Sequence, residues 1–516
     1  MKVKVKVKAP AKARPRWPAT APRCHADRHP RYHRAPRPPA AAPMKSTRYA
    51  ALADEIEQAI AAGVLRPGDR LPSVRQTCAS HTVSPSTVFQ AYYLLEARGL
   101  VRARERSGWF VTEAAPAAPP EPAASSAPDG NAVELDVSAM VFDILEASMS
   151  RAVAPFGSAF PGPELFPLAR LGQEMAAAAQ SLDPRATVDD LTPGLARLRR
   201  QIARRYLADG IAVDPDEIVI TNGALEALNL CLAAVTRPGD AVLVESPCFY
   251  GALQALERLG LRAIEVPTHP RDGIDLDALA SAVSRHAPRA AWLMPSFQNP
   301  LGALMPEARK RELVALLARH GIPLIEDDVY GELWFGERRP PPAKAFDAEG
   351  LVLHCSSFSK SLAPGYRIGW AIPGRFRKTV ARQKLSLSIA TSAPAQIALA
   401  AYLERGGHDR HLRRLRETLR IRQASVLRAI AAHFPEGTRA TRPEGGYFTW
   451  VELPAGGDAL ALHRRALAAG ISIAPGPIFS AGRGFGHCLR INCGHAWDER
   501  AHDAIATLGR LAGRAG

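Results

Sequence analysis

The chain is poor in the features that build disulfide frameworks and membrane spans. Its 516 residues include only seven cysteines, scattered without a Cys-x-x-Cys pair, which argues against a disulfide framework and against a zinc site. No apolar run reaches the roughly 18 residues of a transmembrane helix, and the N-terminus lacks the apolar core of a secretory signal. We therefore expect a protein of the reducing cytoplasm that has no membrane partner.

Acidic residues are nearly absent from residues 1–43. This segment holds twelve Lys and Arg against one acid, Asp27, so twelve minus one, or eleven, of the chain's sixteen net positive charges fall there. Nine prolines and little apolar content predict a disordered tail. The tail is either a basic arm with non-specific affinity for DNA or an extension from a misassigned start, since Met44 directly precedes the first structured pattern.

Bulky residues are also missing from 113–134, an Ala- and Pro-rich stretch that is typical of a linker, extended or disordered. The linker separates a compact segment, 44–112, from a long one, 135–516. In the long segment helical runs alternate with apolar strands, which predicts an α/β fold with βαβ units and a mainly parallel sheet. The expected strands are 217–221, 241–245, 290–294, 323–327 and 352–355.

Residues 44–112 combine three helical patterns with a hairpin. The first helix is predicted by an apolar series at helical spacing: Leu52, Ile56, Ile60 and Val64. The third helix has Ser84 as its N-cap, ends at Gly99 and carries its own apolar stripe: Val88, Ala91, Tyr92 and Leu95. Alternating residues on both sides of Ser107-Gly108 predict a two-stranded hairpin.

This segment resembles the winged helix-turn-helix of GntR-type regulators. The resemblance is carried by Leu71-Pro72-Ser73-Val74-Arg75, Val83-Ser84-Pro85-Ser86-Thr87-Val88 and Ser107-Gly108-Trp109-Phe110-Val111. It implies binding to double-stranded DNA with the third helix in the major groove; the other reading of the polar helix face is a merely solvated surface. The expected DNA contacts are Arg75, Ser84, Ser86, Thr87 and Gln90 from the helices and Arg102, Arg104 and Arg106 from the wing.

One position departs from that family pattern. Many relatives carry arginine where this chain has Pro85, and a proline side chain has no donor for a base or a phosphate. Base reading at this point is therefore expected from Ser84, Ser86 or Thr87, and the target sites of the family need not transfer.

In the long segment, Lys360 follows a short apolar strand, with Ser357 three residues before it and Arg367 seven after. Four further motifs precede it in order: Ile220–Leu228, Glu245–Tyr250, Pro295–Gly302 and Leu324–Tyr330. Each motif is weak alone, because a glycine turn is usually a connection and a strand-end Asp is often a helix cap. Together they resemble fold-type-I aminotransferases that use pyridoxal 5'-phosphate (PLP).

The resemblance implies a role for each matched residue. Lys360 would join the cofactor as an internal aldimine, and Asp327 would keep its pyridine nitrogen protonated. Phe249, or else Tyr250, would stack on the ring, while Asn299 and Tyr330 would share the phenolic oxygen. The phosphate would lie among Gly223, Ala224, Leu225, Ser357, Ser359 and Arg367. Arg490 would bind the α-carboxylate of an amino acid, or else be one surface charge among many.

A second departure lies before Pro193-Gly194, where relatives commonly have a tyrosine that reaches the cofactor phosphate of a neighbouring subunit. This chain has none, so that contribution to cofactor binding is in doubt.

The fusion of both segments resembles the MocR subgroup of GntR-type regulators. That resemblance implies a homodimer whose aminotransferase-like domain senses an amine, an amino acid or the cofactor itself at Lys360 and changes how paired winged helices bind DNA. The alternative is an active aminotransferase with an appended DNA-binding domain, since the cofactor residues do not exclude turnover.

Overall fold

The structure, a computed structural model, describes residues 48–104, 107–112, 118–147, 152–185 and 193–513. The predicted tail at 1–43 therefore lies outside the described residues. Among the described residues, no helix is both long and apolar enough to cross a membrane. The same part of the chain holds no group of three or more His, Cys, Asp or Glu placed to bind a metal ion.

The first described segment is a winged helix, as predicted. It consists of α1 (Arg48–Ala61), α2 (Val74–His81), α3 (Pro85–Ala97), β1 (Val101–Arg104) and β2 (Gly108–Val111). The Oγ atoms of Ser73 and Ser84 accept hydrogen bonds from the backbone N–H groups of Gln76 and Thr87 and so cap α2 and α3. β1 and β2 pair antiparallel, with Arg102 opposite Phe110.

The core of the winged helix confirms most of the predicted apolar positions. The side chains of Leu52, Val88, Tyr92 and Leu95 are buried, and the Tyr92 hydroxyl donates to the carbonyl of Pro72 at 2.6 Å, which ties α3 to the start of α2. Val64 is the exception, at 74% exposed. The prediction failed there because α1 ends at Ala61 and the chain turns at Gly63 (φ 72°) before Val64 can join the helical face.

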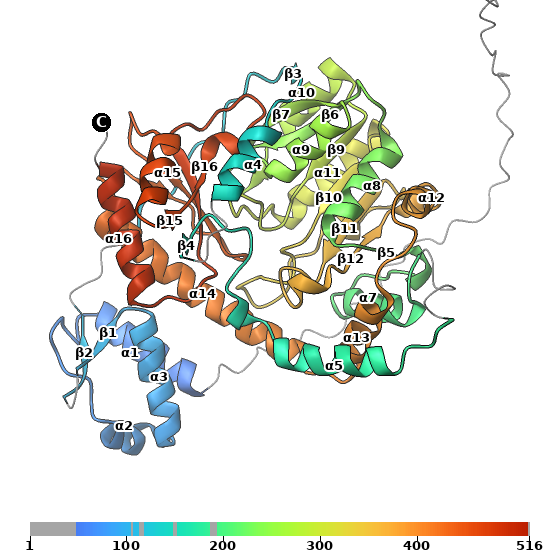
Figure 1. Cartoon of the computed structure of the whole chain (residues 1–516). Coiled ribbons are helices and arrows are strands. Elements are labelled where there is room, and N and C mark those ends of the chain that lie inside the picture. Colours follow the sequence, from blue (N-terminus) through green and yellow to red (C-terminus); the bar gives the residue numbers. More distant parts are fainter. Residues whose placement is uncertain (1–47, 105–106, 113–117, 148–151, 186–192, 514–516) are drawn as a thin grey trace, which may run out of the picture. The chain divides into compact units, whose positions relative to one another are not determined.

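The large domain is built on a central sheet with strand order β3-β7-β6-β9-β10-β11-β12-β5, and β8 adds to β7 (Figure 1). Neighbours from β7 to β11 are parallel, and β12 is antiparallel to both β11 and β5. The mainly parallel sheet is therefore confirmed. The strands are β3 (Ala132–Val133), β5 (Val219–Thr221), β6 (Ala241–Ser246), β7 (Arg262–His269), β8 (Gly273–Ile274), β9 (Ala290–Leu293), β10 (Leu324–Asp327), β11 (Val352–Ser357) and β12 (Gly369–Ile372).

Helices cover both faces of this sheet. Val242 and Val244 of β6 pack in one cluster with residues of α8 and α9, whereas Leu243 packs in another with residues of α10 and α11. This alternation is the period of two expected of a strand buried on both sides. The helices up to α11 are α4 (Ser138–Ala147), α5 (Leu168–Gln180), α7 (Ala196–Ala208), α8 (Ala224–Val235), α9 (Tyr250–Arg258), α10 (Leu276–His286) and α11 (Glu307–Arg319).

The C-terminal part forms a smaller antiparallel sheet, which sequence patterns did not predict. Its strands are β13 (Arg439–Ala440), β14 (Phe448–Glu452), β17 (Cys488–Asn492) and β16 (Ala474–Pro475), in that order. A two-stranded parallel pair, β4 (Ala154–Pro155) with β15 (Ile471–Ser472), anchors the segment that leads to residue 160. The remaining helices are α12 (Arg377–Leu387), α13 (Ala393–Glu404), α14 (His408–His433), α15 (Ala459–Ala468) and α16 (Glu499–Gly513).

Residues 118–131, in the predicted linker, have no helix or strand but are bound to the large domain. The Ala440 amide donates to the Pro120 carbonyl at 3.0 Å, and the Ser126 amide donates to the Thr268 carbonyl at 3.3 Å. β3 then pairs with β7. The central sheet thus already includes residues before 135.

We expect Leu95→Ala to destabilise the winged helix by about 2–5 kcal/mol, because it removes a fully buried side chain and leaves a cavity. The measurement is the hydrogen-exchange free energy of the α1 and α3 amides. Val64→Ala is the matched control and should stay within about 0.5 kcal/mol of the parent, since Val64 is exposed. A cost at Val64 equal to that at Leu95 would contradict this account of the core.

Candidate cofactor site and DNA-binding surface

The predicted cofactor residues meet at the carboxyl edge of the central sheet. Asp327 ends β10, Ser357 ends β11, and Gly223 follows β5. Parallel strands end at the same edge of a sheet, so residues far apart in sequence come together there. Asp327 is level with Cys355 in the register between β10 and β11, and the loop that carries Lys360 begins after the end of β11 at Ser357.

The start of α8 forms a backbone cradle. Gly223 has φ 85°, and α8 has no side-chain cap, so the first amides of the helix, including those of Ala224 and Leu225, lack an intrahelical acceptor. A Cβ on Gly223 would lie 2.5 Å from Nη2 of Arg367. The absence of a side chain therefore lets a guanidinium approach a helix N-terminus, an arrangement that suits a phosphate group.

Hydroxyl groups stand beside this cradle. Arg367 Nη1 donates to Ser359 Oγ at 3.4 Å, and the Ser359 amide donates to Ser357 Oγ at 3.3 Å. Across the cradle, Gly369 of β12 passes so close that a Cβ there would lie 2.5 Å from the backbone carbon of Gly223. The resemblance marked the two serines and Arg367, but it gave no signal for Gly369.

Lys360 is half-buried, and its Nζ donates to the carbonyl of Ala159 at 2.9 Å. The Nζ also lies 3.7 Å from the ring centroid of Phe160. Burial, and then the positive charges of Arg490 and Arg367, lower the pKa of Lys360 to about 7, against the opposing effect of Asp327. A large share of this amine is therefore unprotonated near neutral pH, as attack on a carbonyl requires.

Asp327 is 1% exposed, and its Oδ1 has no hydrogen-bond partner among the described residues. Burial, and then the neighbouring Asp328, raise the pKa of the Asp327 carboxyl to about 7. A buried carboxylate oxygen without a donor is costly. A protonated pyridine nitrogen would supply that donor, so the structure fits the role that the resemblance assigns to Asp327.

The other predicted ring contacts lie nearby. Phe249 is half-buried just before α9 and packs on Tyr250 with ring centroids 4.9 Å apart. Tyr330 is buried against Tyr447, with centroids 5.5 Å apart, and burial raises its pKa above the ordinary value. Asn299 is buried, and its Oδ1 accepts a hydrogen bond from Arg490 Nη1 at 3.0 Å.

Arg490, on β17, is 0% exposed, so its interpretation as a surface charge is wrong. Its Nη2 donates to the carbonyls of Gly157 at 2.8 Å and Ser158 at 3.2 Å. Its Nε has no partner, and no carboxylate lies at ion-pair distance within the described ranges. Burial lowers the pKa of Arg490. A buried guanidinium without a counter-ion suits a ligand carboxylate.

The segment 157–160 was missed by sequence reasoning. Besides the two carbonyls on Arg490, the Ala159 carbonyl accepts from both Lys360 and the Tyr447 hydroxyl, the latter at 3.0 Å. This segment therefore occupies the donors of the two groups expected to bind a ligand. No motif signals it, because about 200 to 330 residues separate it from its partners.

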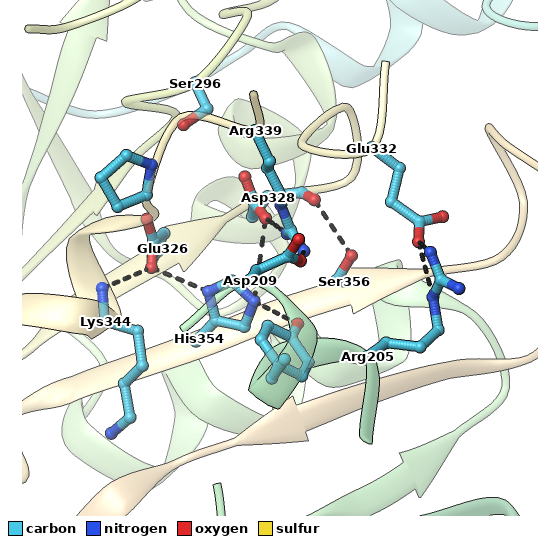
Figure 2. Close-up of polar contacts among 12 residues, drawn as sticks. Arg205, Asp209, Ser296, Glu326, Asp328, Glu332, Arg339, Lys344, His354 and Ser356 are labelled. Carbon is cyan, nitrogen blue, oxygen red and sulfur yellow. Dashed lines mark hydrogen bonds and ion pairs between the residues drawn. The ribbon is translucent and has the colours of Figure 1, made fainter. Parts of the chain in front are cut away.

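A buried polar network flanks Asp327 along β10 (Figure 2). Glu326 contacts Nδ1 of His354 at 2.8 Å, and Asp328 accepts from Arg339 at 2.7 Å. Arg339 also pairs with Asp209 at 2.6 Å. These contacts fix the residues on both sides of Asp327, and Arg339 lowers the cost of burying Asp328, whose pKa burial raises.

A second ion pair in Figure 2 steadies the lysine loop. Ser361, next to Lys360, donates to Glu332 at 2.7 Å, and Glu332 pairs with Arg205 at 2.6 Å. The pKa of Glu332 lies well below its ordinary value: burial alone would raise it, and Arg205 foremost outweighs that effect. The position before Pro193, where relatives have a tyrosine, falls in 186–192, outside the described residues.

The predicted DNA-contacting residues lie on the winged helix. Arg75, Ser84, Ser86 and Gln90 are exposed, and Thr87 is half-buried. Ser84 is already engaged, because its hydroxyl bonds to those of Ser86 at 2.8 Å and Thr87 at 2.9 Å besides capping α3.

The wing is described only in part. Arg102 is exposed on β1. Arg104 lies on β1, but its side chain falls outside the described part, as does the whole of Arg106.

Both segments match known protein families. The profile of the bacterial regulatory proteins of the gntR family matches residues 48–111, and that of aminotransferase class I and II matches residues 174–506. The chain is 47% identical to the uncharacterized HTH-type transcriptional regulator YdcR of Escherichia coli (strain K12), over 90% of this chain and 98% of YdcR.

Two aminotransferases extend the comparison to the large domain. The 2-aminoadipate transaminase of Thermus thermophilus is 34% identical over 71% of this chain and 92% of its own length. The crystal structure of LysN, an alpha-aminoadipate aminotransferase of Thermus thermophilus complexed with N-(5'-phosphopyridoxyl)-L-leucine, matches with TM-score 0.66 and 32% identity, covering 72% of this chain and 94% of LysN. The large domain therefore has the fold-type-I aminotransferase fold, and its cofactor is PLP.

In the cofactor-free protein, we expect Asp327→Asn to change how stability depends on pH. The pKa of Asp327 is about 7 in the folded protein, against an ordinary 3.8, so between these values the folded state holds a proton that the unfolded chain has lost. The contribution of Asp327 is thus fully present below about pH 4 and is lost as pH rises through 7.

Urea unfolding of parent and variant across that range measures the effect. The variant should gain stability relative to the parent as pH rises from 4 to 7. A difference between them that is constant with pH would contradict the raised pKa.

Proposed function

Because the chain belongs to the GntR-type regulators that carry an aminotransferase class I and II domain, the MocR architecture, we propose that it senses an amine or amino acid at Lys360 and transmits binding to its winged helix. DNA is the partner of the winged helix. In this proposal an effector binds in the large domain and its binding is transmitted to the DNA-binding domain. The protein forms a homodimer that presents two winged helices to two half-sites.

The residues of the site divide the work of holding the cofactor. The amides at the start of α8, with Arg367 and Ser359, would bind the phosphate, while Asp327 would hold a proton at the pyridine nitrogen. When bound, PLP supplies an aldehyde that condenses with amines and a ring that withdraws electrons. Because its pKa is lowered, Lys360 can leave the cofactor as a neutral amine when another amine takes its position.

The observation that carries the sensing proposal is the contact of segment 157–160 with both Arg490 and Lys360. An amino acid would place its carboxylate on Arg490 and its amine where Lys360 Nζ lies. The carboxylate would replace the hydrogen bonds from Arg490 to the Gly157 and Ser158 carbonyls, and we propose that the segment then moves. A ligand that distinguishes two states of the protein shifts the population between them, which is the requirement for control of DNA binding.

A second candidate function is transamination. Lys360, the buried Asp327 and Arg490, the residue expected to bind a carboxylate, lie in one site, and a relative named as a 2-aminoadipate transaminase matches 71% of the chain. Lys360 could then also move a proton. Steady-state assay with L-alanine and a 2-oxo acid separates the two: many turnovers per site favour the enzyme, and binding without turnover favours the sensor.

We expect Arg490→Lys to weaken L-alanine binding by roughly tenfold while leaving ethylamine binding unchanged, because lysine keeps the charge but loses the bidentate fork for a carboxylate. The measurement is titration of the visible absorbance of the PLP-loaded protein. L-alanine and ethylamine differ only by the carboxylate, so equal losses for both would contradict the role of Arg490. Lys360→Ala should remove the lysine-dependent absorbance altogether.

We expect Arg102→Ala to weaken DNA binding similarly on all sequences and to reduce the slope of log affinity against log salt by about 1, as for one lost phosphate contact. The measurement is fluorescence anisotropy at several salt concentrations. Arg66→Ala is the control, because Arg66 is an equally exposed arginine in the turn after α1. Equal effects of both variants would show that only net charge matters.

A further inference from the structure

A cavity of about 360 Å³ lies in the large domain at the start of α11, and its lining does not include the predicted cofactor residues. Its lining includes Pro306, which precedes α11, Glu307 and Lys310 of α11, the loop residues Pro340 and Pro341, and Arg338. This volume is within the range of small-molecule sites. The cavity therefore has room for a ligand of a few heavy atoms.

Lys310 is the unusual member of the lining. It is 0% exposed, and its ammonium donates to Ser296 Oγ at 2.7 Å and to the Pro341 carbonyl at 2.9 Å. No carboxylate lies within ion-pair distance of its Nζ in the described part of the chain. A buried ammonium has three donors and is costly without a counter-ion, so this side chain favours an anion beside it.

The charged side chains of the lining balance formally, four cations against four acids, but they differ in their pairing. All four acids have a cationic neighbour: Glu121 and Glu444 pair with Arg271, Asp272 with His269, and Glu307 with Arg311. Lys310 and Arg338, in contrast, have no such partner among the described residues. The guanidinium of Arg442 is directed to the carbonyls of Ala118 and Pro119. Among the described residues, the charged side chains of this lining that lack an ion-pair partner are therefore cationic.

The helix start adds a second attraction. α11 is 13 residues long, begins after Pro306 and has no side-chain cap. Its first amides therefore lack an intrahelical acceptor, and the helix dipole favours negative charge at this end. Although Glu307 lies in the first turn, the buried Lys310, the exposed Arg338 and the uncapped helix start favour an anion, and the cavity gives it room.

We propose that this cavity is a second anion-binding site, for a small molecule that carries a carboxylate or a phosphate monoester, with Lys310 as its charged floor and Arg338 at its rim. The site touches two functional segments. Lys310 holds Ser296, in the loop that carries Asn299. Glu121, which also lines the cavity, bonds to the Arg442 amide at 2.9 Å and belongs to the segment that follows the winged helix.

Sulfate and acetate are the probes, as stand-ins for the phosphate and the carboxylate, each titrated by calorimetry into the PLP-loaded full-length protein at fixed ionic strength. Loading with PLP keeps the probes from the phosphate cradle at α8, and dependence on Lys310 and Arg338 separates binding in this cavity from acetate binding at Arg490. We expect saturable binding of at least one probe. Sulfate alone indicates a phosphate monoester, acetate alone a carboxylate, and both a general anion site; binding of neither overturns the proposal.

Variants locate the site. Lys310→Met keeps the aliphatic volume and should lower the affinity at least tenfold, whereas Arg338→Ala, at an exposed residue, should lower it about threefold without risk to folding. Arg319→Ala removes an exposed arginine at the far end of α11 and should change nothing. Unchanged affinity in both Lys310→Met and Arg338→Ala overturns the proposal.

The pH dependence of anion affinity distinguishes a lysine that binds the anion from one with a structural role alone. Burial lowers the pKa of Lys310 to about 8, helped by Arg339 and opposed by Glu326, Asp328 and Glu307, so the amine is charged below that pH and loses its proton above it. Sulfate and acetate keep their charge from pH 7 to 9, so the affinity should fall over this range in the parent and stay level in Lys310→Met. A parallel fall in both proteins contradicts the role of Lys310.

Discussion

Burial of Lys360, Asp327 and Arg490 in one site is the constraint on which the large domain depends. Arg490 and Asp327 are buried and Lys360 is half-buried, and the Arg490 guanidinium has no carboxylate at ion-pair distance among the described residues, so the site favours an anionic ligand. Burial foremost, and then the charge of Arg490, lowers the pKa of Lys360 and keeps part of its amine unprotonated near neutral pH. A ligand carboxylate would pair with Arg490, a protonated pyridine nitrogen would donate to Asp327, and the cofactor phosphate would bind at the start of α8.

Polar contacts along β10 and its neighbours stabilise the buried acids around Asp327. Glu326 and Asp328 carry charge on either side of Asp327, and His354 and Arg339 compensate them. Without such partners, three consecutive buried acids would repel one another at low dielectric. The network in Figure 2 thus holds the two neighbours of Asp327, whose Oδ1 has no hydrogen-bond partner among the described residues.

The resting hydrogen bonds of segment 157–160 connect binding to shape. Carbonyl oxygens are weaker partners for a guanidinium than a carboxylate, so a ligand with a carboxylate can replace them. The segment is held at its start by the pairing of β4 with β15 and afterwards by Asn492, whose Nδ2 donates to the Ser158 and Phe160 carbonyls at 2.9 and 2.7 Å. The segment therefore has one defined conformation in this structure, which a two-state response requires.

The sequence by itself determined the local features: the serine cap of α3, the apolar stripe of α3, the parallel strands, and the ordered motifs around Gly223, Asp327 and Lys360. These follow from spacing along the chain, which reports neighbours within a few residues. Only the tertiary structure decided that Arg490 is buried, that Gly157 and Ser158 contact it, and that Lys310 lines a cavity. Such contacts join segments up to 333 residues apart, and sheet register and helix packing, which no local pattern contains, bring them together.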